Sequence, residues 1–100
     1  MHGEVVVTLV GKPGCHLCDT AREVVSGVIA EFSGHHDGPL IRLEELSILD
    51  NSVLSDEHGD NIPVVLIDGR AHGFWRIETD EFRQALRSTV LGALAREKGS

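Results

Sequence analysis

The feature that most constrains the fold is a change of hydrophobic period near the start of the chain. Residues 4–10 (EVVVTLV) form a short apolar run rich in β-branched side chains, which is typical of a buried strand. From Leu17 to Phe32 the apolar residues instead recur every three or four positions, which is the spacing of one helix face. A buried strand followed directly by a helix favours a right-handed parallel crossover to a second strand. The sequence therefore predicts an α/β fold.

The middle of the chain predicts a second strand and a hairpin. The glycines and proline of residues 34–39 (GHHDGP) indicate a loop, and residues 40–46 (LIRLEEL) indicate a strand. Residues 62–75 contain two apolar runs on either side of Asp68-Gly69, a dipeptide that favours a type I′ turn. The two strands of this hairpin are therefore expected to be antiparallel to each other.

Two further helices are predicted. One is short and lies within residues 48–61, where Asp50 or Ser52 is expected to cap its start and Gly59 to take the left-handed position after its end. The last helix is expected to be capped by Thr79. The resulting order is strand, helix, strand, short helix, strand, strand, helix. It predicts a four-stranded mixed sheet with helices on both faces.

Length and charge limit the class of protein. The 100 residues suffice for one domain, which we expect to span residues 1–100. The formal net charge of −7 argues against nucleic acid and against an anionic membrane surface as partners, since both are bound through Lys and Arg. No apolar run approaches the roughly 20 residues of a membrane span. The first residues show no basic region before an apolar stretch, so we expect a cytoplasmic protein.

The only two cysteines, Cys15 and Cys18, stand at the expected start of the first helix. Unpaired N–H groups and the positive end of the helix dipole favour a thiolate at this place, and the thiolate is the nucleophilic form of cysteine. Cys15 is therefore expected to attack a substrate disulfide, and Cys18, one turn further in, to resolve the mixed disulfide. Lys12 and a protonated His16 would add favourable positive charge, and we assign both to the substrate-binding residues.

The motif Cys15-His16-Leu17-Cys18, the Ile62-Pro63-Val64 segment and the Asp-Gly hairpin together resemble the glutaredoxin branch of the thioredoxin superfamily. The likeness is greatest to the small bacterial glutaredoxin-like proteins. The resemblance implies a thioredoxin-like, glutaredoxin-type fold in which Pro63 follows a cis peptide bond and faces the cysteine pair. It also implies that the backbone at Ile62, Pro63 and Val64 binds substrate by pairing with a peptide or thiol ligand, like an added strand.

The chain departs from the usual glutaredoxin pattern in two places. It has no tyrosine, whereas Cys-Pro-Tyr-Cys is the usual motif, and Gly73 stands alone where a Gly-Gly pair followed by an acid usually helps to bind glutathione. The predicted partner is therefore a disulfide-containing protein or a low-molecular-weight thiol. The reductant is left open between glutathione, another small thiol and a thioredoxin-type protein.

The main hypothesis is a thiol–disulfide oxidoreductase that needs no cofactor and no metal. Three alternatives stay open. The cysteines would form half of a zinc site if His35 and His36 completed it, although adjacent histidines do not match the usual ligand spacing. Two chains would share an iron–sulfur cluster, or one would carry a metal as a delivery protein. The cysteines would otherwise be an unreactive pair in a fold that serves only protein contacts.

Overall fold

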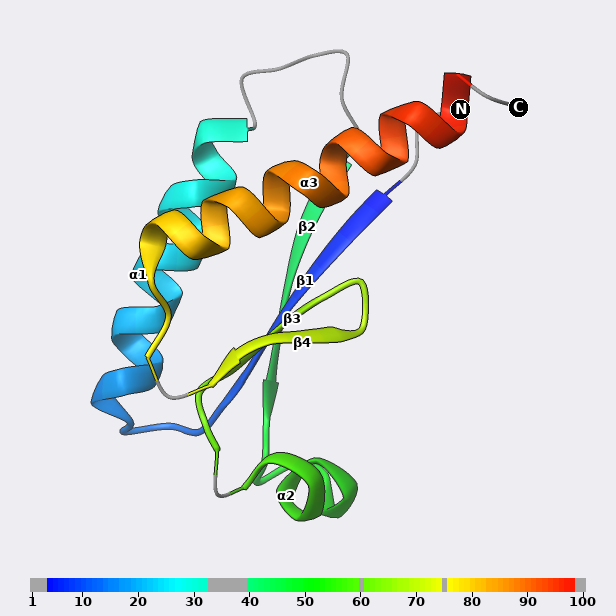
Figure 1. Ribbon diagram of the computed structural model, residues 1–100. Coiled ribbons are helices and arrows are strands. Elements are labelled where there is room, and N and C mark those ends of the chain that lie inside the picture. The colour runs from blue at the N-terminus through cyan, green and yellow to red at the C-terminus, as the bar shows by residue number, and fades with distance from the viewer. Residues whose placement is uncertain (1–3, 33–39, 60, 75, 99–100) are drawn as a thin grey trace.

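The computed structural model describes residues 4–32, 40–59, 61–74 and 76–98 (Figure 1). Seven elements follow one another in the predicted order: β1 (Glu4–Gly11), α1 (His16–Phe32), β2 (Leu40–Ser47), α2 (Ser52–His58), β3 (Val64–Ile67), β4 (Arg70–Phe74) and α3 (Thr79–Lys98). The predicted loop 34–39, which includes His35 and His36, lies outside the described residues, as does Trp75. None of the helices in the described segments has the length and apolar character needed to cross a membrane.

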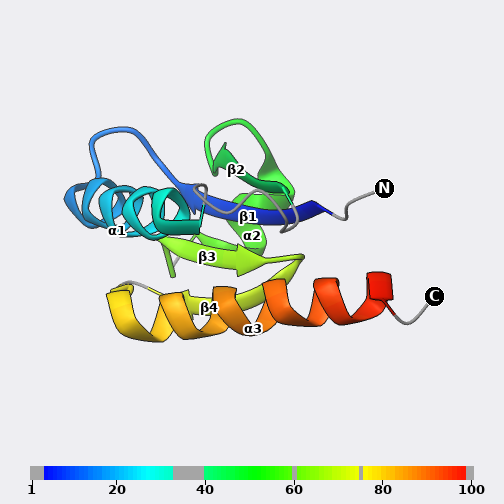
Figure 2. The ribbon, with the colours of Figure 1, turned by 90° about the horizontal axis from the view of Figure 1, so that it is seen from above.

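The four strands form one mixed sheet in the order β2-β1-β3-β4 (Figure 2). β1 is parallel to β2 and antiparallel to β3, and β3 and β4 are antiparallel. The predicted α/β class with a four-stranded mixed sheet is confirmed. Because β1 is central, the loop that follows it emerges between two neighbouring strands, which positions that loop for a site.

The hydrophobic core lies between the sheet and the two long helices. α1 and α3 contact each other and β1, so they share one face of the sheet. Alternate residues of β1 point to this face, as the period of a strand requires. The core joins β1, α1, β3 and α3 through Val5, Val7, Leu9, Val25, Val28, Val65, Ile67, Phe82 and Leu86. On the opposite face, Val10 and Val64 are fully buried at the end of the sheet where β2 leads into α2.

The hairpin between β3 and β4 turns as predicted. Asp68 and Gly69 both have positive φ, at 50° and 82°, which is the conformation of a type I′ turn. The Asp68 carboxylate also accepts a hydrogen bond from the N–H of Val6 at 2.9 Å. The turn is thereby tied to the start of β1.

The predicted ends of the short helix were wrong. Asn51, and neither Asp50 nor Ser52, caps α2, because its side chain accepts a hydrogen bond from the N–H of Val53 at 2.9 Å. Gly59 is right-handed, with φ −54° and ψ −34°, and its N–H donates to the carbonyl of Ser55. A Cβ at Gly59 would collide with that carbonyl oxygen. Glycine is therefore needed here for the close approach of the backbone to Ser55, and not for a left-handed turn.

The start of α3 lies one residue earlier than predicted. Thr79 is already the first helical residue, and the carbonyl of Glu78 accepts a hydrogen bond from the N–H of Phe82 at 3.0 Å. Glu78 therefore holds the cap position that the sequence predicts for Thr79.

Candidate functional site

The two cysteines lie where β1 ends and α1 begins. Pro13 and Gly14 form a turn between these elements, and Gly14 has φ 76°, a conformation that favours glycine. Cys15 is the residue directly before α1, and its carbonyl accepts a hydrogen bond from the N–H of Asp19 at 3.1 Å. Cys15 therefore occupies the N-cap position of α1.

The sulfur of Cys15 serves as the cap of this helix. It accepts a hydrogen bond from the backbone N–H of Cys18 at 3.2 Å, the contact that an N-cap side chain makes with the third helical residue. Both cysteines are free thiols, and Cys15 is partly exposed while Cys18 is buried. The arrangement thus presents one sulfur to solvent and holds a second sulfur directly behind it.

Burial raises the pKa of the Cys18 thiol above its ordinary value. A hydrogen bond to Cys15 raises this pKa further, because it stabilises the protonated form in which Cys18 donates. The backbone N–H of Lys12 acts in the opposite direction by bonding to Cys18, and the negative charges of Cys15 and Asp19 raise the pKa again. Cys18 is therefore held mainly as the thiol, which suits a group that reacts second.

The other residues predicted for the site lie at the same end of the sheet. Val64 pairs with Val10 at the end of β1, so Pro63 lies alongside the segment that leads into the cysteines. The Ile62–Pro63 peptide bond is cis. Pro63 and Val64 are fully buried and Ile62 is half-buried, so Ile62 is the residue of the three that a ligand can reach.

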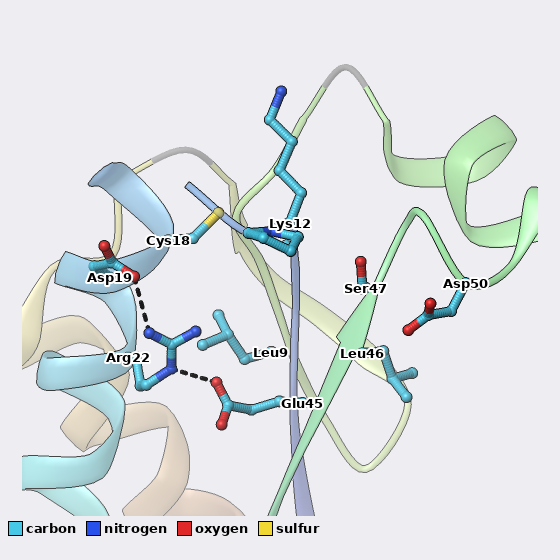
Figure 3. Close-up of a pocket in the computed structure, with 11 residues that line it drawn as sticks. Leu9, Lys12, Cys18, Asp19, Arg22, Glu45, Leu46, Ser47 and Asp50 are labelled. Atoms are coloured by element: carbon cyan, nitrogen blue, oxygen red, sulfur yellow. Dashed lines mark hydrogen bonds and ion pairs between the residues drawn. The ribbon is translucent and has the colours of Figure 1, made fainter. Parts of the chain in front are cut away.

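Lys12 and His16 flank the cysteines on the surface. Both residues are exposed, and His16 is the first residue of α1. Figure 3 shows the Lys12 side chain extending away from Asp19 and Arg22. The described contact of Lys12 with the thiol pair is therefore made by its backbone, while its ammonium group faces solvent.

A pocket of about 370 Å³ opens beside Cys18, between the start of α1 and the end of β2 (Figure 3). Charged side chains of Asp19, Arg22 and Glu45 form part of its wall. Arg22 bonds to Asp19 through Nη1 at 2.9 Å and to Glu45 through Nε. The pairing of Asp19 and Arg22 follows from their i,i+3 spacing, whereas nothing in the sequence indicated Glu45, which comes from another element.

Gly11 is a second residue whose role the sequence did not reveal. The local pattern marks it only as the end of a strand, but a Cβ at this position would lie 2.8 Å from the sulfur of Cys18. The close approach of β1 to Cys18 therefore requires glycine.

Changing Gly11 to alanine is expected to lower the free energy of unfolding by about 1–3 kcal/mol, because the added methyl overpacks a buried contact. The displaced Cys18 sulfur should also reach Cys15 more slowly in thiol exchange. Urea unfolding and stopped-flow exchange measure the two effects. Gly27 in α1 is the matched control, since a Cβ there meets nothing within 4 Å. Gly27→Ala should instead stabilise the protein by about 0.5–1 kcal/mol, and an equal loss in both variants would contradict the steric argument.

Within the described residues, no group of three or more His, Cys, Asp and Glu side chains is placed to hold a metal ion. His35 and His36, the histidines of the zinc alternative, are outside those residues. The described site therefore offers two thiols and one charged pocket.

Comparisons with known proteins agree with this fold. The family model described as "Glutaredoxin-like domain (DUF836)" matches residues 6–87. Uncharacterised proteins from Mycobacterium tuberculosis and Mycobacterium bovis are each 29% identical over 87 residues, which is 87% of this chain and 88% of theirs. A structural genomics target protein from X. campestris superposes with a TM-score of 0.64 at 25% identity, over 82% of this chain and 96% of that chain. A mutant thioredoxin from Halobacterium salinarum has the same fold, with a TM-score of 0.54 at 19% identity over 91% of this chain and 75% of that one.

Proposed function

The chain belongs to the glutaredoxin-like domain family whose model covers residues 6–87, and on that premise we propose that it is a thiol–disulfide oxidoreductase. The fold supports a function of redox type. In the proposal, Cys15 is the nucleophile and Cys18 the resolving thiol. The partner is a disulfide-containing protein or a low-molecular-weight thiol, and the proposed compartment is the cytoplasm, where thiols are kept reduced.

The hydrogen bond from the N–H of Cys18 to the sulfur of Cys15 carries the proposal. A backbone N–H at a helix start has no partner within the helix, and it stabilises a negative charge at the N-cap position. The Cys15 sulfur thus receives a backbone hydrogen bond at the place from which it would attack a substrate. Since Cys15 is also partly exposed, its sulfur is accessible to a substrate.

The proposed reaction has two exchange steps. The Cys15 thiolate attacks one sulfur of a substrate disulfide, so that a mixed disulfide forms and the other substrate sulfur leaves as a thiolate. Cys18 then loses its proton to solvent and attacks the Cys15 sulfur, which releases the second substrate sulfur. The protein ends with a Cys15–Cys18 disulfide, and the substrate is reduced by two electrons.

The residues around the pair support substrate binding in this proposal. The backbone at Ile62, which is half-buried, would pair with an extended segment of the substrate, and the buried Pro63 and Val64 would hold that backbone in place. Lys12 and His16 would border the same position from the other side, because one precedes the cysteine turn and the other begins α1. Their exposed side chains are free to face a bound partner.

Trapping of the mixed disulfide tests the proposal. Cys18→Ser, incubated with a small aromatic disulfide or a disulfide-bonded protein, should accumulate an adduct through Cys15. Cys15→Ser should form the adduct at least about tenfold more slowly, because the remaining thiol is buried. Mass spectrometry of the intact protein and of its peptides measures both. Equal trapping in the two variants, or none in either, would overturn the assigned roles. A brown protein that holds iron and labile sulfide after anaerobic purification would instead favour a cluster.

A further inference from the structure

The pocket beside Cys18 is lined by charged side chains that take no direct part in the proposed exchange reaction. Cys18 is only 1% exposed, yet it lines this pocket together with Asp19, Arg22 and Glu45 (Figure 3). The pocket lies on the β2 side of the cysteines, whereas Pro63 belongs to the β3 side. A substrate held beside Pro63 would therefore leave this pocket open to solvent.

Arg22 joins two elements on the wall of the pocket. Its Nη1 lies 2.9 Å from Asp19 on its own helix, and its Nε bonds to Glu45 on β2. The hydrogen bond to Glu45, followed by that to Asp19, raises the pKa of the Arg22 guanidinium, which therefore stays charged. One cation is thus placed between two carboxylates.

Without the Arg22 cation, the charges around Cys18 disfavour its ionisation. Besides Cys18, the titratable and charged groups that line the pocket are Lys12, Asp19, Arg22, Glu45 and Asp50, while Cys15 interacts with Cys18 directly. Three of them are carboxylates, and the ammonium group of Lys12 faces away (Figure 3). The Asp19 charge in particular acts against an ionised Cys18. Arg22 is the group placed to offset that charge.

We propose that Arg22 is a positioning residue for the second exchange step: by pairing with Asp19 and Glu45 it offsets the carboxylates of the pocket that Cys18 lines and so permits Cys18 to lose its proton. This inference rests on the proposed function, because the step that Arg22 would affect is the attack of Cys18 on the mixed disulfide. In that attack the proton of Cys18 passes to solvent in the pocket. The Cys18 thiolate then bonds to the Cys15 sulfur, and the substrate sulfur leaves as a thiolate.

The sign of the effect follows from electrostatics. Loss of Arg22 leaves Asp19, whose charge acts on Cys18, and Glu45 on the same pocket wall without their cation, and negative charge disfavours a thiolate. The pH at which Cys18 is half-ionised should therefore rise. Because the three side chains are roughly half exposed, solvent reduces the effect to about two- to fivefold in thiolate population at neutral pH. The difference should disappear at a pH above both midpoints.

A thiolate titration in the Cys15→Ser background provides the test. The chain has no tyrosine, so the ultraviolet absorbance of the thiolate reports Cys18 without interference from phenolates. Adding Arg22→Met should raise the midpoint, and adding Asp19→Asn to that variant should lower it again. With both cysteines present, Arg22→Met should slow the release of substrate from a preformed Cys15 adduct about two- to fivefold near neutral pH. An unchanged midpoint would overturn the proposal.

Arg83 supplies a matched control. It also bonds to an acid three residues earlier, Asp80, and to an acid of another helix, Glu31, but it does not line the pocket beside Cys18. Arg83→Met should leave the midpoint of Cys18 ionisation unchanged. If Arg22→Met and Arg83→Met raise this midpoint equally, Arg22 has no specific role beside Cys18. The titration does not depend on exchange activity. A protein that forms no Cys15 adduct would therefore contradict the proposed function, while a shifted midpoint would still support the role of Arg22.

Discussion

Replacing Cys15 with serine is expected to reduce the catalysed reduction of a disulfide to the uncatalysed rate, a loss of at least about a thousandfold. A serine hydroxyl is not ionised near neutral pH, and the helix start that favours a thiolate does not suffice to ionise it. Cys18 does not replace the lost nucleophile, because its sulfur is buried behind position 15. Stopped-flow measurement of disulfide reduction, with the reductant in excess, gives the rate for each variant.

The same substitution should leave the fold intact, which makes the loss interpretable. Serine is among the preferred N-cap residues, so its hydroxyl is able to accept the hydrogen bond that the Cys15 sulfur now accepts from Cys18. The free energy of unfolding should therefore change by less than about 1 kcal/mol. Cys18→Ser is the companion variant, and it should retain the first exchange step. A Cys15→Ser protein that keeps most of the activity would show that the attacking sulfur has been assigned wrongly.

Replacing Phe82 with alanine is expected to lower the free energy of unfolding by about 3–5 kcal/mol. Phe82 is fully buried in the core between the sheet and the two long helices. Its ring also makes an edge contact with His72, at 5.8 Å between ring centroids. The substitution removes the apolar burial and leaves a cavity that the surrounding helices and strands fill only in part. Because a small domain is stable by only about 5–15 kcal/mol, the substitution should remove a large fraction of the stability.

Urea unfolding followed by circular dichroism measures this loss. Phe82→Leu should cost less, about 1–2 kcal/mol, because it retains most of the apolar volume. Leu91→Ala on the same helix is the surface control, since Leu91 is 55% exposed, and it should change the stability by no more than about 0.5 kcal/mol. Similar losses at Phe82 and Leu91 would contradict the placement of the core.

The order of the elements was predictable because each one carries a local signal. The apolar run of β1, the helical spacing of α1 and the Asp68-Gly69 turn are read within a few neighbouring residues, and the structure confirms all three. The capping errors were local as well. Asp50, Asn51 and Ser52 are three consecutive residues of similar capping preference, and sequence alone does not rank them when their side chains compete for the same N–H group.

The sequence by itself determined that two cysteines one turn apart stand at the start of a helix, because strand and helix periods, glycines and cysteine spacing are properties of neighbouring residues. Only the tertiary structure decided which side chains surround those sulfurs. Gly11 contacts Cys18 because β1 passes directly behind α1, and Glu45 meets Arg22 because the sheet places β2 beside β1. Such contacts depend on strand order and packing. They join residues far apart in the chain, so no local sequence pattern predicts them.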